Sequence, residues 1–354
     1  MKILVIQQKM IGDVLTSTVI CEALRKEYPD ATIDYLVNSN TKPVILGNPF
    51  FNTIVEFKNE YRNNKKAFYS FLKEIKKSKY DLVVDAYGKL ESNLISYFSK
   101  APKKISFHKW YTQFLYSKVI YRNPEPITNA SIAIENRLRL VYPEDKIATN
   151  IIRPKIFLTE EEKNTSKTYL EQHKITPETP LIMISVLGSE MRKTLPFDYM
   201  AKVIDEIVTT TSANILFNYI PNQEKDAKAI YNLTTQNTQK HIHFNVFGKS
   251  LREFIAILSH CDALIGNEGG AVNMAKALDK PTFTIFSPWI LKKDWNMFED
   301  GITHESVHLY DTKPELYWDK TPKEMKDQAI ELYKNLSSEL IIPKLRSYLQ
   351  NLNL

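Results

Sequence analysis

Short apolar runs alternate with amphipathic stretches along the whole chain. In the first half, five strands are predicted, and two of them are apolar along most of their length, as strands buried on both faces of a parallel sheet are. They are expected at residues 2–6, 32–37, 53–57, 80–84 and 104–107. Between the first two strands, apolar residues recur every three to four positions over 14–28, which predicts a helix that ends at Pro29. A strand, a crossover helix and a second strand make the βαβ unit of a doubly wound fold.

The same alternation returns after a polar segment at 143–160, where Thr159 and Glu162 have the spacing of a capping box. Strands are expected at 181–186, 213–218, 241–246, 262–266 and 281–286. Helices are expected at 160–173, 197–210, 223–233, 251–259 and 271–279, with one or two more over 322–352. The repeated pattern predicts an α/β protein with two Rossmann-like domains facing each other across a cleft. We place the domains at 1–155 and 156–335, and expect a last helix, 336–354, to pack back on the N-terminal domain.

Length and composition agree with this organisation. The 354 residues suffice for two domains, and 43% hydrophobic and 25% charged residues are typical of globular proteins. Cys21 and Cys261 are too few for a disulfide framework, and no Cys/His cluster has zinc spacing, so a reducing compartment without a structural metal is expected. Apolar runs are too short for a secretory signal or a membrane span, which favours a cytoplasmic location.

Charge is divided unevenly between the two halves. Residues 1–155 hold 25 Lys and Arg against 15 Asp and Glu, whereas the remainder holds 22 against 26. The stretch 58–109 is the most basic, with 13 basic and 5 acidic residues. A basic half is expected to meet an anionic partner such as a phosphorylated lipid, a nucleic acid or a membrane surface. A solvated lysine-rich surface is the alternative.

Ligands of open α/β sheets bind beyond the carboxyl ends of the strands, so the residues after each strand are candidates. Gly12 and Asp13 follow the first strand. A single glycine is not the dinucleotide fingerprint, which argues against a nicotinamide-dependent enzyme. An aspartate is ionised at neutral pH and can accept the proton of a hydroxyl group, although capping of the next helix is an equally simple role.

Two loops of the second half carry groups suited to a nucleotide. After its first strand, Gly188 allows a close backbone approach, Ser189 offers a hydrogen bond and Lys193 supplies a positive charge for a phosphate. An ordinary loop with exposed basic residues is the alternative. After the second strand, Glu224 has the chemistry to bind ribose hydroxyls, or simply to serve as a first-turn helix acid.

A glycine-rich turn after strand 262–266 gives the sharpest signal. The amides of Gly269, Gly270 and Ala271 are expected to point outward at the start of a helix, where they would form an anion site. The neighbouring Glu268 would repel a phosphate, so it suits the hydroxyls of a sugar better. A tight turn that needs glycine is the alternative.

Four motifs together resemble glycosyltransferase family 9, the heptosyltransferases. They are KILVI with GDV at 12–14, DAYG at 85–88, the GS and KxxP elements over 188–196, and GNEGGAVNMAKALDKPT at 266–282. Their order and spacing agree from residue 1 to about 290. The resemblance implies a GT-B architecture and an inverting transfer of heptose from ADP-heptose to the inner core of lipopolysaccharide. It also implies that the N-terminal domain binds the acceptor and the C-terminal domain binds the donor.

The resemblance assigns the catalytic base to Asp13 and the phosphate-binding lysine to Lys193. The donor-binding residues that it implies are Gly188, Ser189, Lys193, Glu224, Glu268, Gly269, Gly270 and Ala271. The candidates for acceptor binding are Gly12 and the basic residues Arg62, Lys103, Lys104 and Lys109. The expected partners are a nucleotide-diphosphate sugar and an anionic glycolipid, with peripheral contact at the inner membrane and no nucleic acid. Neither a cofactor nor a metal ion is expected.

The late glycine motif departs from the family pattern. An Asp followed by Ser/Thr-Gly, with a His further on, is usual there, whereas this chain has Glu268, Gly269 and Asn273. These differences concern which donor sugar and which nucleotide base the protein binds. They do not affect the role of Asp13 as the catalytic base. A non-catalytic protein that kept the GT-B shell is the remaining alternative, and the presence of both Asp13 and Lys193 speaks against it.

Overall fold

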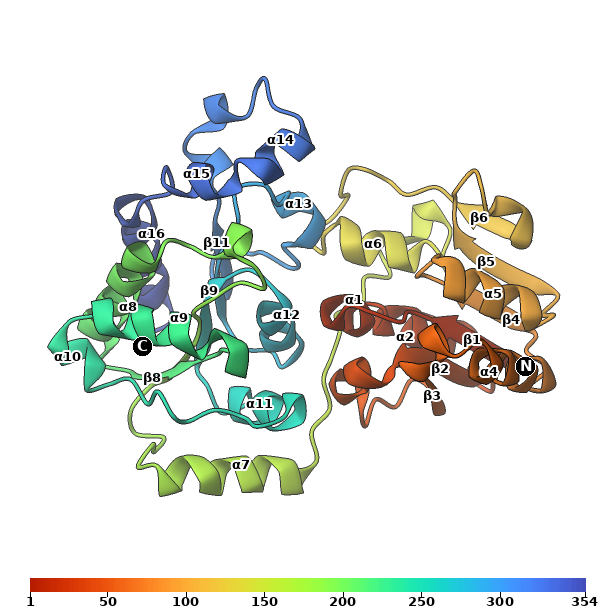
Figure 1. Cartoon of the computed structure of the whole chain (residues 1–354), viewed down its shortest axis with the longest axis horizontal. Helices are drawn as coiled ribbons and strands as arrows, with labels where there is room; N and C mark the ends of the chain where they lie inside the picture. Colours follow the sequence, from red (N-terminus) through yellow and green to blue (C-terminus); the bar gives the residue numbers. More distant parts are fainter. The chain divides into compact units, whose positions relative to one another are not determined.

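The computed structural model describes all residues from 1 to 354 (Figure 1). The chain forms two compact units, Met1–Phe157 and Leu158–Leu354. Each unit is built on one sheet whose paired strands all run parallel. Among the helices, none combines the length and the apolar character that a membrane span requires.

The first unit contains a six-stranded sheet in the order β3-β2-β1-β4-β5-β6. Its strands are β1 (Lys2–Ile6), β2 (Thr32–Asn38), β3 (Thr53–Phe57), β4 (Leu82–Asp85), β5 (Lys103–Phe107) and β6 (Lys118–Ile120). The side chains from Ile3 to Ile6 are inaccessible to solvent because β1 lies in the middle of the sheet, between β2 and β4. The strand order reverses between β1 and β4, and such a switch point is where doubly wound sheets bind ligands.

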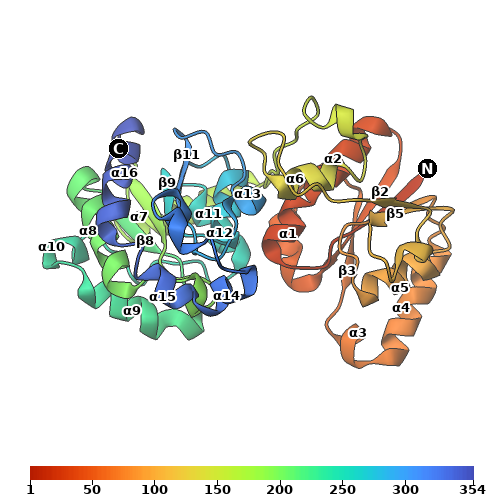
Figure 2. The same ribbon diagram turned by 90° about the horizontal axis from the view of Figure 1, so that it is seen from above.

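Helices cover both faces of this sheet. They are α1 (Ile11–Thr16), α2 (Thr18–Glu27), α3 (Glu60–Asn63), α4 (Lys65–Lys77), α5 (Leu90–Phe98) and α6 (Ile132–Leu138). Figure 2 shows α2 with α6 on one face, and α4 with α5 on the other. The single helix expected at 14–28 is in fact two helices separated at Ser17, and the first begins at Ile11. Asp13 therefore lies inside the first helical turn rather than in the loop before it.

The second unit contains a five-stranded sheet in the order β11-β10-β9-β7-β8. Its strands are β7 (Leu181–Ser185), β8 (Asn214–Phe217), β9 (Ala263–Asn267), β10 (Thr282–Ile285) and β11 (His304–Val307). Here the order reverses between β7 and β9. The loops that follow these two strands carry Lys193 and Glu268, so these two of the predicted donor residues flank the switch point of this sheet.

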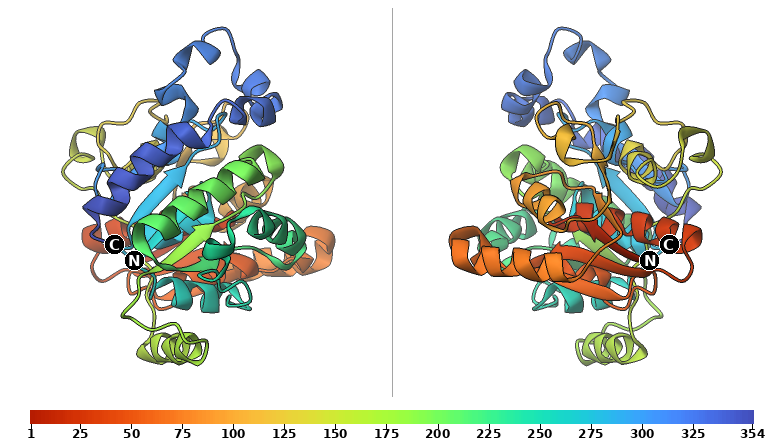
Figure 3. Two further views of the ribbon diagram at one scale, coloured as in Figure 1. Left: turned by 90° about the vertical axis from the view of Figure 1, so that its left-hand side faces the viewer. Right: turned by 90° about the vertical axis from the view of Figure 1, so that its right-hand side faces the viewer.

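Ten helices complete the second unit, and the last one packs within it. They are α7 (Glu160–Gln172), α8 (Phe197–Thr211), α9 (Glu224–Leu233), α10 (Gln236–Gln239), α11 (Leu251–Leu258), α12 (Gly270–Ala277), α13 (Lys292–Trp295), α14 (Pro322–Asp327), α15 (Ala329–Tyr333) and α16 (Ser338–Asn351). The left view of Figure 3 shows α16 lying along α8, and α16 also contacts β11. Its buried residues Ile341, Leu345 and Leu349 join the core of this unit. The expectation that residues 336–354 pack back on the N-terminal domain is therefore wrong.

The segment 241–246 does not form the expected strand, despite its alternating apolar residues. Only Ile242 bridges to Ile215 of β8. Four residues later, the amide of Val246 donates to the carbonyl of His243, which turns the backbone away from the ladder. β6 and β11 are short, contain polar residues and were not among the strands predicted from the sequence.

Candidate functional site

Four loops meet at the carboxyl edge of the second sheet. They follow β7, β8, β9 and β10, and they contain all the residues predicted to bind a donor. Because these strands are parallel and adjacent, their carboxyl ends lie side by side. The structure thus gathers residues that are up to 83 positions apart, from Gly188 to Ala271, at one edge of one sheet.

Asn267 ties two of these loops together. Its side chain is fully buried at the end of β9, and its Nδ2 donates to the carbonyl oxygens of Ser185 and Val186 at 3.0 Å each. Its Oδ1 accepts the amide of Leu195 at 2.8 Å. One amide side chain thus links the end of β9 to both ends of the loop that carries Lys193.

Lys193 and Glu268 form an ion pair across these loops. The Lys193 Nζ lies 3.1 Å from the Glu268 Oε1, and the two side chains are 24% and 10% exposed. The distance is that of an ion pair, but the alignment is not that of a hydrogen bond, so the buried Oε1 has no hydrogen-bond partner. Lys193 also lies over the ring of Trp289, 5.5 Å from its centroid. The lysine charge therefore lies beside the start of α12, next to a carboxylate.

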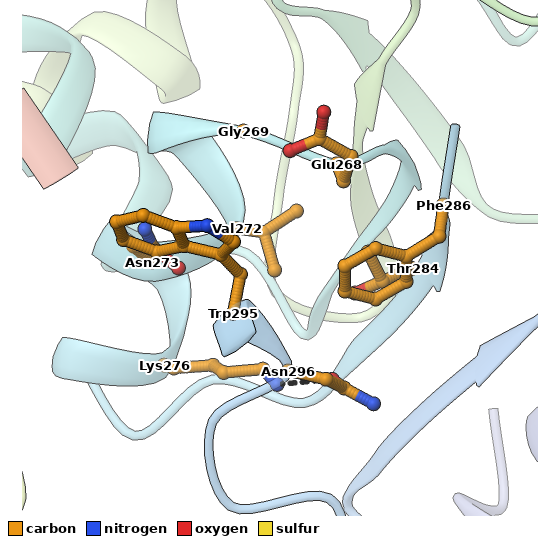
Figure 4. A pocket seen from close by; sticks show the side chains of 9 residues that line it. All are labelled: Glu268, Gly269, Val272, Asn273, Lys276, Thr284, Phe286, Trp295 and Asn296. Atoms are coloured by element: carbon orange, nitrogen blue, oxygen red, sulfur yellow. Dashed lines mark hydrogen bonds between the residues drawn. The ribbon is translucent and has the colours of Figure 1, made fainter. Parts of the chain in front are cut away.

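The start of α12 has the features of an anion site. Gly269 is its N-cap, and no side chain caps the helix, so the first backbone amides have no intrahelical acceptor. The φ angle of Gly269 is +156°, and a Cβ added there or at Gly270 would meet nothing within 4 Å. Both glycines border open space, but the backbone conformation of Gly269 favours glycine, in line with the tight-turn alternative, whereas nothing around Gly270 requires one. Figure 4 shows Gly269 at the start of α12, beside Glu268. Backbone amides and the helix dipole favour a negatively charged group at such a position.

The other predicted donor residues have different surroundings. Gly188 is buried, and a Cβ there would lie 2.2 Å from the carbonyl oxygen of Lys193. Glycine is therefore needed at position 188 because the backbone of Lys193 packs against it, and not because a ligand approaches it. Ser189 and Glu224 are exposed, and Glu224 is the first residue of α9. The neighbouring Gln223 donates from Nε2 to the carbonyl of Gly188 at 2.8 Å, which joins the β8 loop to the β7 loop.

In the first unit, Asp13 is held by an arginine that the sequence analysis did not identify. The Asp13 Oδ1 lies 2.7 Å from Nη2 of Arg137, and its Oδ2 accepts the amide of Met10 at 3.2 Å. The second contact is the capping role that the sequence offered as an alternative. A carboxylate has about four lone-pair positions, so two contacts leave room for a hydroxyl group. The Asp13 side chain is 28% exposed and remains accessible.

Basic side chains crowd the carboxyl edge of the first sheet. The Nζ of Lys109 donates to the carbonyl of Gly88 at 2.5 Å, in a turn that buried Asp85 organises by accepting the Gly88 amide. Burial lowers the pKa of Lys109, and the charges of Lys89 and Arg122 lower it further. The pKa of Arg122 is lowered by burial and by the charge of Arg137. These groups repel one another, so an arriving anion would relieve the repulsion.

The predicted acceptor residues do not all lie at this edge. Gly12 and Arg62 follow β1 and β3 at their carboxyl ends, and the Arg62 Nε is 3.8 Å from Glu91. Lys103 and Lys104, in contrast, begin β5 and pair in register with Leu82 and Val83. As the first residues of β5, they lie at the amino edge of the sheet, opposite the carboxyl edge where the strand ends. Lys103 and Lys104 thus lie at the opposite edge of the sheet from Gly12, with which they were grouped as acceptor candidates.

Comparison with known proteins identifies the family. The model of glycosyltransferase family 9 (heptosyltransferase) matches residues 68–310. The chain belongs to glycosyltransferase family 9. It is 22% identical to lipooligosaccharide heptosyltransferase 2 of Haemophilus influenzae over 296 residues, which make up 81% of this chain and 84% of that protein.

Solved structures of the family have the same fold as this glycosyltransferase. The family 9 glycosyl transferase of Veillonella parvula gives a TM-score of 0.82 at 17% identity, covering 99% of this chain and 97% of that one. The ADP-heptose lipopolysaccharide heptosyltransferase II of Escherichia coli gives 0.72 at 17% identity, covering 95% and 99%. The prediction of a GT-B protein made of two Rossmann-like domains is confirmed.

Several residues of this family 9 glycosyltransferase were missing from the sequence-based site. They are Arg122, Arg137, Gln223 and Asn267. Asn267 ends a strand and could have been found by the same rule that drew attention to Glu268. Arg137 lies on a helix with no motif around it, so nothing in the sequence linked it to Asp13. No three His, Cys, Asp or Glu side chains come together in the arrangement that a metal ion requires.

Proposed function

We propose that this glycosyltransferase transfers heptose from ADP-heptose to an anionic lipopolysaccharide or lipooligosaccharide acceptor, with inversion at the anomeric carbon. The observation that carries the proposal is the convergence of Lys193, Glu268 and the uncapped start of α12 at one sheet edge. A heptosyltransferase relative and the heptosyltransferase structure named above support heptose as the sugar. The latter is an ADP-heptose lipopolysaccharide heptosyltransferase, which supports ADP-heptose as the donor.

The second unit is assigned to the donor. Cleavage of the sugar–phosphate bond leaves a nucleoside diphosphate, so negative charge grows on the pyrophosphate as the reaction proceeds. The Lys193 ammonium group and the amides of Gly270 and Ala271 are suited to stabilise that charge, and groups fixed in advance are the most effective for this purpose. Ser189 and Glu224 are assigned to further donor contacts because the loop contact at Gln223 holds their segments together.

The ion pair between Lys193 and Glu268 prepares the donor site. Glu268 holds the lysine at the start of α12 in the absence of an anion. When the pyrophosphate arrives, Lys193 gains a second negative partner, and the Glu268 carboxylate becomes available to hydroxyl groups of the sugar. A carboxylate repels phosphate but accepts hydrogen bonds from hydroxyl groups. The pair therefore directs the pyrophosphate of the donor to Lys193 and the sugar to Glu268.

The first unit is assigned to the acceptor. Asp13 takes the proton from the attacking hydroxyl, and Arg137 fixes the orientation of its carboxylate. A nucleoside diphosphate leaves as an anion and needs no proton, so one carboxylate is sufficient, in contrast to the pair used in glycoside hydrolysis. Lys109 and Arg122, with Arg62, are assigned to phosphate or carboxylate groups of the glycolipid. The same basic edge would support peripheral contact with the cytoplasmic surface of the inner membrane.

The test is a transfer assay with a panel of nucleotide sugars and a lipooligosaccharide acceptor, in which nucleoside diphosphate release and product mass are measured. We expect turnover with ADP-heptose, and a loss of rate of at least about a hundredfold in Asp13→Ala, as expected when a general base is removed. Asp30→Ala is the control, because Asp30 is exposed and lies before β2 at the amino edge of the sheet. Turnover with another donor only would overturn the substrate assignment, and an unchanged rate in Asp13→Ala would overturn the role of Asp13.

A further inference from the structure

Large apolar side chains are exposed just beyond the ends of four neighbouring strands of the first sheet. These strands are β1, β4, β5 and β6, which lie next to one another in this order (Figure 1). Because all four run parallel, their carboxyl ends lie along one edge. The residues are Met10, Leu90, Trp110 and Tyr121, with 66–78% of each exposed. Single exposed apolar residues are common, but four along one edge indicate a surface that meets a partner.

Each of these four apolar residues is next in sequence to a basic residue. The pairs are Lys9 with Met10, Lys89 with Leu90, Lys109 with Trp110, and Tyr121 with Arg122. The same combination thus recurs after four different strands, in segments that share no other motif. We call these eight residues the docking edge.

The positive charge of the docking edge is only partly offset by acids. Within three residues of the four pairs, the acids are Asp13, Glu91 and Glu125. The Asp13 Oδ1 lies 2.7 Å from Nη2 of Arg137, and the Glu91 Oε1 lies 3.8 Å from Nε of Arg62, so two of these acids face further arginines. From 92 to 124 the chain has six Lys and Arg residues and no Asp or Glu. An anionic partner therefore complements this edge.

The connection between β5 and β6 is anchored from inside and keeps its rings outside. Near its start Lys109 donates to a carbonyl of the neighbouring turn, and near its end Tyr116 donates to the buried carboxylate of Asp85 at 2.6 Å. Between these two anchors, the side chains of Trp110 and Phe114 are exposed. The fold thus fixes the segment while its largest rings remain in contact with water.

Exposed apolar residues beside lysine and arginine match the chemistry of a bilayer surface. Tryptophan and tyrosine favour the headgroup region, because their rings are apolar and also carry a polar group. Aliphatic side chains enter the acyl boundary beside it, and each basic residue near an anionic surface strengthens binding roughly fivefold. A nucleic acid also attracts basic and aromatic residues, but base stacking requires aromatic rings, which Met10 and Leu90 lack.

We propose that the docking edge binds the surface of an anionic phospholipid bilayer, with its four apolar side chains in the headgroup region and its basic side chains at lipid phosphates. Met10 lies three residues before Asp13, so docking would bring the headgroup of a membrane-bound glycolipid toward that carboxylate. This inference rests on the proposed function for its purpose, and it adds the apolar residues that would enter the bilayer. Bilayer binding itself requires no sugar donor.

The first test measures how the full chain sediments with vesicles of phosphatidylglycerol and phosphatidylcholine that contain no glycolipid. Trp110→Ala should weaken binding at least about fivefold without lowering the melting temperature, because the lost indole contacts lipid and not protein. Trp318→Ala is the matched control, since Trp318 is 75% exposed but belongs to the second unit. It should bind vesicles like the wild type. Equal binding by Trp110→Ala and the wild type would overturn the proposal.

The second test separates local charge from net charge by comparing two exposed lysines of the first unit. Lys89→Gln should weaken binding to the mixed vesicles roughly fivefold. Lys103→Gln should leave it unchanged, because Lys103 lies at the amino edge of the same sheet. Vesicles of phosphatidylcholine alone should bind the wild type at least about tenfold more weakly than the mixed vesicles. Equal weakening by both variants would reduce the effect to net charge and contradict the docking edge.

Fluorescence locates the bilayer on the molecule. The chain has four tryptophans, and those other than Trp110 belong to the second unit. Brominated lipids should quench the fluorescence of the wild type. Trp110→Phe keeps an aromatic ring, so it should still bind vesicles, but the quenching should disappear. Quenching that persists in this variant would place the bilayer elsewhere and contradict the proposal.

Two other occupants of this edge give different results. Binding that appears only after lipooligosaccharide is added would assign the apolar residues to the acceptor itself. A changed oligomeric state of Trp110→Ala in sedimentation equilibrium, with unchanged vesicle binding, would assign them to a second copy of the chain. Either result overturns the proposal.

Failure of this inference and failure of the proposed function are distinguishable. The vesicle assays contain no nucleotide sugar, so their outcome holds even if the transfer assay reveals a different donor. If ADP-heptose is the donor and the protein does not bind the mixed vesicles, the docking edge fails alone.

Discussion

Every nitrogen of the Arg137 guanidinium has an acceptor. Its Nε donates to Ser17 Oγ, its Nη1 to the carbonyl of Ala133 and its Nη2 to Asp13 Oδ1, each at 2.7 Å. Ser17 separates α1 from α2, and Asp13 is one turn before it. The arginine therefore fixes both the start of α1 and the orientation of the carboxylate, because its planar fork leaves little freedom of rotation.

Replacing Arg137 with Met should reduce kcat at least about tenfold while changing the KM for the donor little, since Asp13 loses the group that orients it. The matched control is Arg139→Met. Arg139 is two residues further along, its side chain is 5% exposed, and it pairs with Glu144 at 2.8 Å. Both variants should lose stability, but only Arg137→Met should lose kcat in steady-state kinetics. Equal loss of kcat in both would show that the effect of Arg137 is only structural.

The residues around Asp13 show what sequence reasoning can reach. Asp13, Lys193 and Glu268 were found because they follow strands, and strand ends converge in a parallel sheet. Arg137 is 124 positions from Asp13 and contacts it only through tertiary packing. Contacts of this kind have no periodicity or motif to reveal them.

At the scale of elements, one carboxylate of α7 both caps its own helix and contacts α11. Glu162 completes the capping box predicted from the sequence, accepting the Thr159 amide at 2.8 Å. It also accepts two hydrogen bonds from Arg252 of α11, at 2.5 and 2.8 Å. Chiefly because of Arg252, the pKa of Glu162 falls from 4.5 to about 2. The local motif predicted the cap, whereas the partner on α11 depends on how the two helices pack.

Glu162→Gln should lower the free energy of unfolding by about 2 kcal/mol at pH 7, since a pKa held below its unfolded value stabilises the charged, folded form. The difference from wild type should be complete above pH 4.5 and shrink as the pH falls toward 2, the folded value. Urea unfolding at several pH values measures it. Glu161→Gln is the control, because Glu161 is an exposed acid in the same helical turn. A difference independent of pH would contradict this account.

The strands missed by the sequence analysis have a common physical reason. β6 and β11 have only three and four residues, and each begins with a polar residue, Lys118 or His304. Both lie at a sheet edge, where the apolar run typical of a central strand is not needed. β6 is incompletely buried, whereas β11 is mostly buried but consists largely of polar residues. The opposite error at 241–246 arose because alternation predicts a strand but not how far its pairing with a neighbour continues; here the pairing with β8 ends after His243.

At the scale of the whole molecule, α16 is an integral part of the second unit. It is the last helix of the chain, and its apolar face packs on α8 and β11. Its basic residues bind to the same unit, with Arg346 at 2.7 Å from Glu206 and Lys344 at 2.9 Å from Glu305. The sequence predicted a helix here, but an amphipathic pattern does not specify which of two cores receives its apolar face.

Leu345→Ala should destabilise the second unit by about 2–5 kcal/mol, because Leu345 is completely buried and its removal leaves a cavity. Hydrogen exchange should become faster in α8 and β11 while the strands from β1 to β5 keep their protection. Gln350→Ala, at an exposed position of α16, is the control. Equal loss of protection in both units would show that α16 does not act through the contacts described here.

The amide side chain of Asn267 joins the donor loops in a way that does not depend on pH. It donates twice and accepts once, a combination that a carboxylate of the same shape lacks because it has no proton to give. An amide also does not titrate, so neither acid nor alkali changes its bonding. The two loops that carry Lys193 and Glu268 are therefore joined by a contact that does not change with pH.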